Sequence, residues 1–400
     1  MKRRRVLLAA AAATAGGMAR PSVAGAAVPS TASPAFLVHG RGSAWIVGPG
    51  PAQALPAAVP PVATAEGAWA VDAAGVAQRW RAVGQVAGRD RPDRSPVPPP
   101  AWAVDASHAT GEPVHALAAS ADGAWVLLAH GERATLLDAG ARPVRTYDGS
   151  NLERTRRSRA QALFAHAGRS SLIATWPAMA ELWEIQLDPS APPIFDGLVH
   201  DWRMGEALPS PGFLGVRRVA LEAPPAGVVL ADPRVPWVAG LSDGGVAVLH
   251  LDVRRRVATL AIAHARLQAS ALPAAGRTGP WWLPAGDAVH VVDTARWRVE
   301  STVPAPAGLV TLADADAAVW ALAEDGLLRW QSGHWQTVAA LDAAPVALAR
   351  DRLRGQWLVA VQDAPGAASA AVLRLDDQGR TLARVPLPAA QPIEGLAALG

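Results

Sequence analysis

Short runs of apolar residues alternate with turn residues along almost the whole chain. In a typical copy, a turn with Gly or Asp leads into an apolar run that contains Trp, and a second turn leads into another apolar run. The copy at residues 121–128 and 134–138 shows both runs. Short runs bounded by turn residues are typical of β-strands, so each copy predicts a β-hairpin. No long segment with a helical repeat interrupts the series, which predicts an all-β protein.

Eight copies of the hairpin can be counted, and a tryptophan marks each of them. The markers are Trp45, Trp69, Trp125, Trp183, Trp237, Trp281, Trp320 and Trp357. Successive markers are 37 to 58 residues apart, except for a first step of 24, and the copies around Trp45 and Trp183 fit the pattern more loosely. A hairpin cannot bury its apolar face alone, whereas four-stranded blades packed around an axis can. We therefore predict an eight-bladed β-propeller over residues 34–400, with a two-domain β-sandwich as the alternative.

Three segments interrupt the repeat. Residues 82–100 are rich in Arg, Asp and Pro and are expected to form an exposed loop, and residues 151–159 are expected to form a charged turn. The third segment, residues 188–225, is far longer than a connection within a blade needs. Long loops in compact domains are usually functional or disordered. Because this one is dense in His, Arg, Glu and aromatic residues, we expect it to be functional.

The N-terminus has the composition of an export signal. Lys2 and three arginines precede a small-residue apolar stretch at residues 6–19, and Ala24-Gly25-Ala26 offers a cleavage site. We expect residues 1–26 to be a cleaved signal peptide, of the twin-arginine or the general type, because the stretch is too short to span a membrane. The expected location is the periplasm.

Charge and cysteine content exclude two classes of function. Of 37 Lys and Arg residues, five would leave with the signal peptide, and the remaining 32 against 34 acidic residues give the mature chain a net charge near −2. A nucleic-acid-binding protein would carry a basic footprint instead. The chain has no cysteine, so it has no disulfide, thiolate ligand or covalently attached c-type haem.

Several motifs stand close together between residues 112 and 265. They are ELWEI at 181–185, PIFDGLVHDWRMGE at 193–206, GFL at 212–214 and the arginine pair at 217–218. These motifs resemble the cytochrome d1-type propeller family. That family comprises the haem d1 domain of cytochrome cd1 nitrite reductase and its relatives in haem d1 biosynthesis, including NirF-like proteins. The family fold is an eight-bladed propeller, which agrees with the repeat count.

The resemblance implies a function in denitrification. It implies binding of haem d1 or its dihydro precursor, and partners among other haem d1 biosynthesis proteins or nitrite reductase. A self-sufficient nitrite reductase is excluded because the c-type haem motif is absent. Whether the chain is an oxidoreductase acting on the precursor or a carrier stays open. The alternatives are a haem-free propeller scaffold of the nitrite reductase system and a propeller hydrolase, for which no carboxylate or metal cluster is found.

Two histidines are the candidate catalytic residues. The resemblance places His200, in Val-His-Asp, and His264 on the distal side of the haem, where family histidines supply protons or hydrogen bonds to a bound anion. Histidine suits this role because it titrates near neutral pH. An ordinary loop histidine is the alternative interpretation of each.

Arginines are the candidate partners of the haem carboxylates, because the planar guanidinium binds both carboxylate oxygens. The candidates are Arg203, Arg217, Arg218 and Arg157, with Glu206 expected to orient His200 or Arg203. The alternative is solvated charge, or pairing with nearby acidic residues.

The residue that would serve as the proximal iron ligand is not identified by the motifs. The second hairpin, where the resemblance would place a histidine, has none. His39 and His115 are therefore the candidate metal ligands. The alternatives are that the iron is held differently or that the protein binds no haem.

Overall fold

The computed structural model describes most of the chain beyond its first 34 residues. The described residues are 35–40, 42–48, 52–83, 101–120, 122–195, 209–223, 226–232, 237–242, 244–273, 279–362, 369–387 and 392–399. The described residues all belong to the second of two units, Ser33–Gly400. The predicted signal peptide lies outside the described residues.

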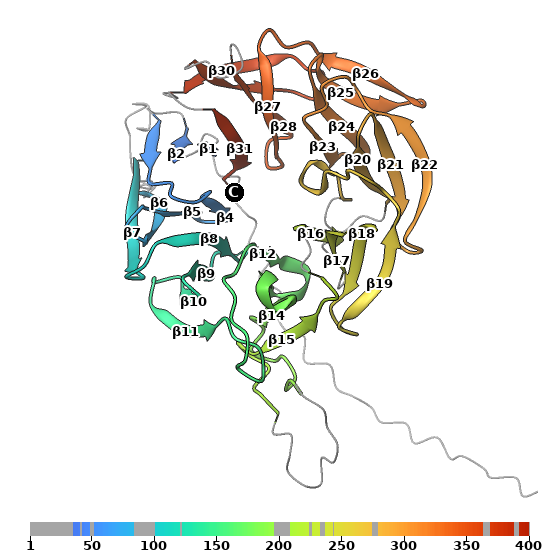
Figure 1. The fold of residues 1–400 in the computed structure, drawn as a ribbon. Helices are drawn as coiled ribbons and strands as arrows, with labels where there is room; N and C mark the ends of the chain where they lie inside the picture. The colour runs from blue at the N-terminus through green and yellow to red at the C-terminus, as the bar shows by residue number, and fades with distance from the viewer. Residues whose placement is uncertain are drawn as a thin grey trace, which may run out of the picture. The chain divides into compact units, whose positions relative to one another are not determined.

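In the second unit, the described strands form eight antiparallel sheets that surround one axis as blades (Figure 1). From the axis outward, the first four blades are β31 (Ile393–Ala398), β1 (Phe36–Gly40), β2 (Ser43–Val47) and β3 (Gln53–Leu55); β4 (Val62–Thr64), β5 (Gly67–Val71), β6 (Val76–Val83) and β7 (Ala101–Ala109); β8 (Val114–Ala119), β9 (Trp125–His130), β10 (Arg133–Asp138) and β11 (Pro143–Asp148); and β12 (Leu163–His166), β13 (Ser171–Trp176), β14 (Glu181–Gln186) and β15 (Val216–Ala220). The other four are β16 (Ala226–Asp232), β17 (Trp237–Ser242), β18 (Gly245–His250) and β19 (Arg255–Leu260); β20 (Trp281–Ala285), β21 (Ala288–Asp293) and β22 (Arg298–Pro304); β23 (Thr311–Ala315), β24 (Ala318–Ala323), β25 (Gly326–Gln331) and β26 (His334–Ala339); and β27 (Ala344–Asp351), β28 (Gln356–Gln362), β29 (Ala370–Leu375) and β30 (Thr381–Leu387).

The other regular elements of the described residues are single helical turns. They are the 3-10 helices η1 (Ala167–Arg169), η2 (Pro177–Met179) and η4 (Leu267–Ala269). Within the described residues, no helix is both long and apolar enough to cross a membrane.

The eight tryptophan markers fall in eight different blades, so the predicted propeller with eight blades is confirmed. In five blades the marker lies on the second strand from the axis, and in the blade of β20 it lies on the first of the three strands. Trp45 and Trp183, the two looser copies, lie on third strands instead. This explains why Trp45 and Trp69 are only 24 residues apart, since Trp45 lies on the third strand of its blade and Trp69 on the second strand of the next.

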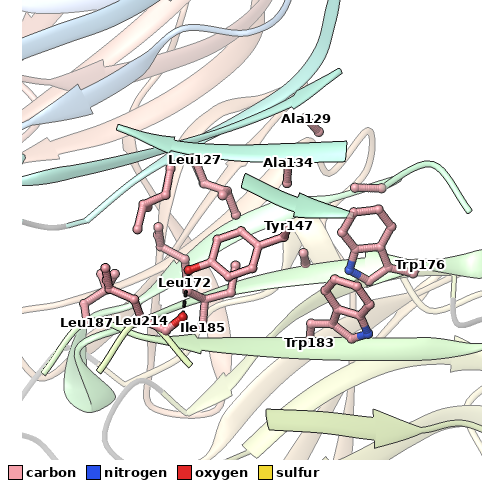
Figure 2. Packing of buried hydrophobic residues seen from close by; sticks show 14 of the residues in the cluster. Leu127, Ala129, Ala134, Tyr147, Leu172, Trp176, Trp183, Ile185, Leu187 and Leu214 are labelled. Carbon is pink, nitrogen blue, oxygen red and sulfur yellow. Dashed lines mark hydrogen bonds between the residues drawn. The ribbon is translucent and has the colours of Figure 1, made fainter. Parts of the chain in front are cut away.

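Each pair of neighbouring blades shares one apolar core, and together these cores close the ring. The core between the blades of β9 and β14 contains Leu127, Leu172, Tyr147 and the tilted Trp176–Trp183 pair, whose ring centroids are 4.5 Å apart (Figure 2). Eight such clusters are found among the described residues, one between each pair of neighbouring blades. The two-domain sandwich is therefore wrong, because the series of cores has no break.

The ends of the propeller meet in one sheet. β31 pairs with β1 in antiparallel register, so the last strand becomes the innermost strand of the first blade. One blade departs from the four-strand pattern. Inside β20, a coil that contains η4 takes the place of a strand and is joined to β20 by the isolated bridges Ala265–Ala285 and Ala271–Trp282.

The segment predicted as one long loop, residues 188–225, contains a strand. β15 lies within it and forms the outer edge of the blade of β14. The sequence pattern missed this strand because the consecutive Arg217 and Arg218, one on each face, interrupt the apolar alternation. In the other predicted loop, β6 ends at Val83 and β7 begins at Ala101; residues 84–100 lie outside the described residues.

Candidate functional site

The long connection between β14 and β15 is clamped at its base. Ile194 and Ser210 form an isolated antiparallel bridge, in which the Ser210 amide donates to the Ile194 carbonyl at 2.8 Å and the Ile194 amide donates to the Ser210 carbonyl at 2.9 Å. The chain between them carries His200, Arg203 and Glu206. These three predicted site residues lie outside the described residues.

A cavity of about 570 Å³ opens beside this clamp, and we call it the Phe195 cavity. One wall is apolar and comes from Pro192, Pro193, Ile194 and Phe195, the last of which is 57% exposed. The charged part of the lining comes from three arginines and two aspartates, Arg169, Arg217, Arg254, Asp188 and Asp252. The cavity thus joins an apolar surface to guanidinium groups, a combination that suits a flat ligand with carboxylates.

A buried carboxylate organises the charged wall. Glu184 on β14 is fully buried and accepts two hydrogen bonds from Arg169, at 2.5 and 3.1 Å, and one from the Ser171 hydroxyl at 3.1 Å. Arg217 lies 3.6 Å from the same carboxylate. A buried charge is tolerated only when it is paired and hydrogen-bonded, so this arrangement fixes both arginines in place.

Asp252 joins the two arginines from the next blade. It accepts hydrogen bonds from Arg169 at 2.9 Å and from Arg217 at 3.2 Å. Burial alone would raise the pKa of Asp252, but the hydrogen bonds and charges of Arg169 and Arg217 outweigh it and hold this pKa below its usual value. Arg217, a predicted haem-carboxylate partner, is therefore already paired with carboxylates of the protein.

Arg218 points to the other face of β15 because successive side chains of a strand alternate. Its guanidinium carbon lies 4.2 Å from the ring centroid of Trp183, and it donates to the Ser150 carbonyl at 2.8 Å and to Glu181 at 3.2 Å. This side chain lines a second cavity, of about 600 Å³, between β11 and β15. We call it the rim groove.

The predicted arginines are thus divided between two cavities. Arg157 lines the rim groove together with Arg218 and lies 3.3 Å from Glu132, while Arg217 lines the Phe195 cavity. Both Arg217 and Arg218 belong to the outermost strand of their blade, so they lie at the rim (Figure 1).

A third cavity of about 450 Å³ lies between the blades of β9 and β14. Its lining includes the fully buried His166, the last residue of β12, together with Ser120 and Asp122. No sequence motif indicated this site, because His166 stands among other strand-end histidines without a motif around it.

The two candidate iron ligands lie in different blades. His39 on β1 faces Gly395 on β31, and a Cβ on that glycine would come within 2.1 Å of the imidazole Nε2. The Nδ1 atom of His39 is buried without a hydrogen-bond partner among the described residues, and burial lowers the pKa of this histidine although Glu394 opposes the shift. This nitrogen could bind an iron only if the residues that bury it moved apart.

His115 and His264 have different surroundings. His115 on β8 has Nε2 at 2.9 Å from the Ala160 carbonyl and Nδ1 at 3.5 Å from Arg159, so both ring nitrogens are engaged. Burial lowers the pKa of His115, and the charge of Arg159 adds to the effect. His264 is exposed in a left-handed turn, with φ at 55°, between β19 and β20. In the part of the chain that the structure describes, no three His, Asp or Glu side chains gather into a group that could hold a metal ion.

Comparison with known proteins identifies the fold. No family model and no curated protein sequence matches the chain. The solved structure "Dihydro-heme d1 dehydrogenase NirN in complex with DHE" matches with a TM-score of 0.65 at 17% identity, over 90% of this chain and 74% of that one. A functionally unknown protein from Desulfotomaculum acetoxidans DSM 771 matches with a TM-score of 0.42 at 10% identity, over 92% and 99% of the two chains. The first likeness, at this low identity, establishes a shared propeller fold.

Proposed function

We propose that this propeller binds haem d1 or its dihydro precursor and acts in haem d1 biosynthesis for denitrification, as a NirF-like protein exported to the periplasm. The motifs between residues 181 and 218 support the proposal, as does the fold shared with dihydro-haem d1 dehydrogenase, a protein solved in complex with DHE. Other haem d1 biosynthesis proteins or nitrite reductase are the expected partners.

The observation that carries the proposal is the clamped connection beside the Phe195 cavity. The segment with the family-like motifs leaves the blade at a bridge whose Ile194 also lines a cavity that combines apolar residues with three arginines and two aspartates. An apolar macrocycle with several carboxylates would contact the apolar residues and the arginines. The described lining of this cavity comes from two neighbouring blades, those of β14 and β18.

Each residue then has a stated part in binding. Phe195 and Ile194 would contact the ring, and Arg217 and Arg254 would hold carboxylates, with Arg203 as a further partner. His200 would face the iron and donate or accept a proton near neutral pH. Either bound tetrapyrrole would supply the iron centre, and the dihydro precursor would also supply an oxidisable side chain. The protein residues would orient it and exclude water from one of its faces.

One observation favours a second candidate function. Arg217 already contacts Asp252 and Glu184, so a carboxylate ligand would have to compete with Asp252. A haem-free scaffold of the nitrite reductase system would keep these pairs and the clamp but bind no tetrapyrrole.

A titration with variants separates the two functions. The purified protein is titrated with haem d1 and with its dihydro precursor while the visible spectrum is followed, using wild type, His200→Ala, Arg217→Gln and His334→Ala. His334 is exposed at the start of β26 and serves as the matched control. We expect a spectral shift that changes form in His200→Ala, weaker binding by Arg217→Gln, and wild-type behaviour of His334→Ala. An identical shift in His200→Ala would overturn the iron-facing role of His200.

A further inference from the structure

The rim groove holds a concentration of arginines outside the Phe195 cavity, where the tetrapyrrole is proposed to bind. Its described lining contains four guanidinium groups, those of Arg145, Arg154, Arg157 and Arg218, but one carboxylate, that of Asp148. The groove has a volume of about 600 Å³ and lies between β11 and β15, the outermost strands of neighbouring blades. It opens on the opposite side of β15 from Arg217.

Two of these four guanidinium groups, those of Arg145 and Arg154, form no ion pair with a carboxylate of the described residues. Arg157 and Arg218 have Glu132 and Glu181 at 3.3 and 3.2 Å. Arg145 donates instead to an uncharged acceptor, the Leu214 carbonyl, at 2.9 Å, and lies over the ring of Tyr147. The Leu214 carbonyl also accepts the Tyr147 hydroxyl at 2.9 Å, which fixes this side of the groove (Figure 2).

Arg154 is held in position by its backbone rather than by its side chain. The Asn151 side-chain oxygen accepts the amides of Thr155 and Arg156 at 2.8 and 2.9 Å, and the Arg154 amide donates to the Asn151 carbonyl at 3.0 Å. Arg154 itself has φ at 57°, a left-handed conformation that costs energy for a residue with a Cβ. Such strain persists where the surrounding structure imposes it, often at binding sites. Its guanidinium makes no hydrogen bond or ion pair with the described residues, so it is available to a ligand.

We propose that the rim groove binds an extended acidic segment of a partner protein. Carboxylates match the guanidinium groups, which bind them through two parallel hydrogen bonds. The position favours a polypeptide over a small molecule, because among the described strands neither β11 nor β15 has a partner on its outer edge. Leu152, 54% exposed beside Arg154, adds an apolar contact for such a segment. This inference goes beyond the proposed tetrapyrrole function and uses a different cavity.

The test uses a fluorescein-labelled decapeptide of alternating Glu and Gly, with fluorescence anisotropy as the readout and the full mature protein as the binder. Arg154→Gln is the main variant, because it removes a guanidinium group that has no partner among the described residues. Glutamine has about the same backbone preference as arginine. We expect it to weaken peptide binding about threefold, and Arg145→Gln with Arg154→Gln together to weaken it about tenfold. Raising NaCl from about 50 to about 500 mM should weaken binding to wild type as well.

Three controls make the result decisive. Arg352→Gln, at an exposed turn between β27 and β28, should bind the peptide as wild type does. A peptide of alternating Gln and Gly should not bind. Haem d1 titration of Arg154→Gln should match wild type, so that failure here is distinguishable from failure of the proposed function. Unchanged peptide affinity in Arg154→Gln, or citrate competing as strongly as the peptide on a molar basis, would overturn the docking proposal.

Discussion

Arg217 and Arg218 are neighbours in the sequence but belong to different cavities. Strand alternation sends Arg217 toward Glu184 and Asp252, and Arg218 over the ring of Trp183. Glu184 is fully buried, and an unpaired carboxylate in the interior lowers the free energy of unfolding. Removing an arginine that pairs with Glu184 should therefore destabilise the protein. Arg169, which makes both close hydrogen bonds to Glu184, is its principal partner.

Removing Arg169 should therefore destabilise the protein far more than removing Arg217. We expect Arg169→Gln to lower the free energy of unfolding by about 3 kcal/mol, because Glu184 loses both close hydrogen bonds from a guanidinium. Arg217→Gln should cost about 1 kcal/mol or less, since Glu184 keeps Arg169. Urea unfolding followed by tryptophan fluorescence measures both. Equal losses in the two variants would contradict the assignment of Arg169 as the principal partner.

At the scale of elements, the Ile194–Ser210 bridge determines where the family-like connection begins and ends. It consists of main-chain hydrogen bonds alone, so a side-chain substitution that keeps the amide leaves it intact. Its role in the candidate site is to hold Phe195 at the Phe195 cavity.

Breaking the bridge should expose the connection to protease. Ser210→Pro removes the amide that donates to Ile194, whereas Ser210→Ala keeps it and is the matched control. We expect trypsin to cut after Arg203 faster in Ser210→Pro than in wild type, with Ser210→Ala unchanged, as measured by mass spectrometry over time. The same rate in all three proteins would show that the bridge does not constrain the connection.

The sequence predicted the inner parts of the blades better than their outer strands. Central strands such as β9 and β28 are buried on both faces and therefore appear as apolar runs with Trp. Outer strands such as β22, with five exposed residues followed by a partly buried and an exposed one, have no apolar run to detect. β15 has no apolar run either, and the sequence therefore predicts a loop there.

At the scale of the molecule, one strand closes the ring. β31 comes from the far end of the chain and pairs with β1, and its Ile393 packs in the same core as Phe36 and Val38. Without it, the first blade loses its inner strand and one of the eight cores is opened.

Deleting residues 393–400 should therefore impair the whole propeller rather than one blade. We expect a lower midpoint of thermal unfolding and aggregation at lower temperature, because apolar surface of the β1–β28 core is exposed. A variant that lacks only Gly400 is the control. Light scattering during heating measures both, and an unchanged midpoint in the long deletion would contradict ring closure by β31.

The candidate site was only partly predictable. Sequence motifs indicated the connection with His200 and the arginine pair, but they could not show that Arg217 and Arg218 face different cavities, since this depends on the strand that the arginines conceal. Nor could they show Glu184 as a buried partner or His166 in a third cavity, because these roles arise from contacts between distant residues. Fold and repeat number were predictable because they follow from local periodicity.

Tetrapyrrole binding is the central claim, and a stoichiometric titration of the wild-type mature protein with haem d1 tests it most directly. The account predicts a shift of the visible spectrum that saturates at one haem d1 per chain. No shift, or a change that grows without saturation, would contradict it and leave the haem-free scaffold as the function of this propeller.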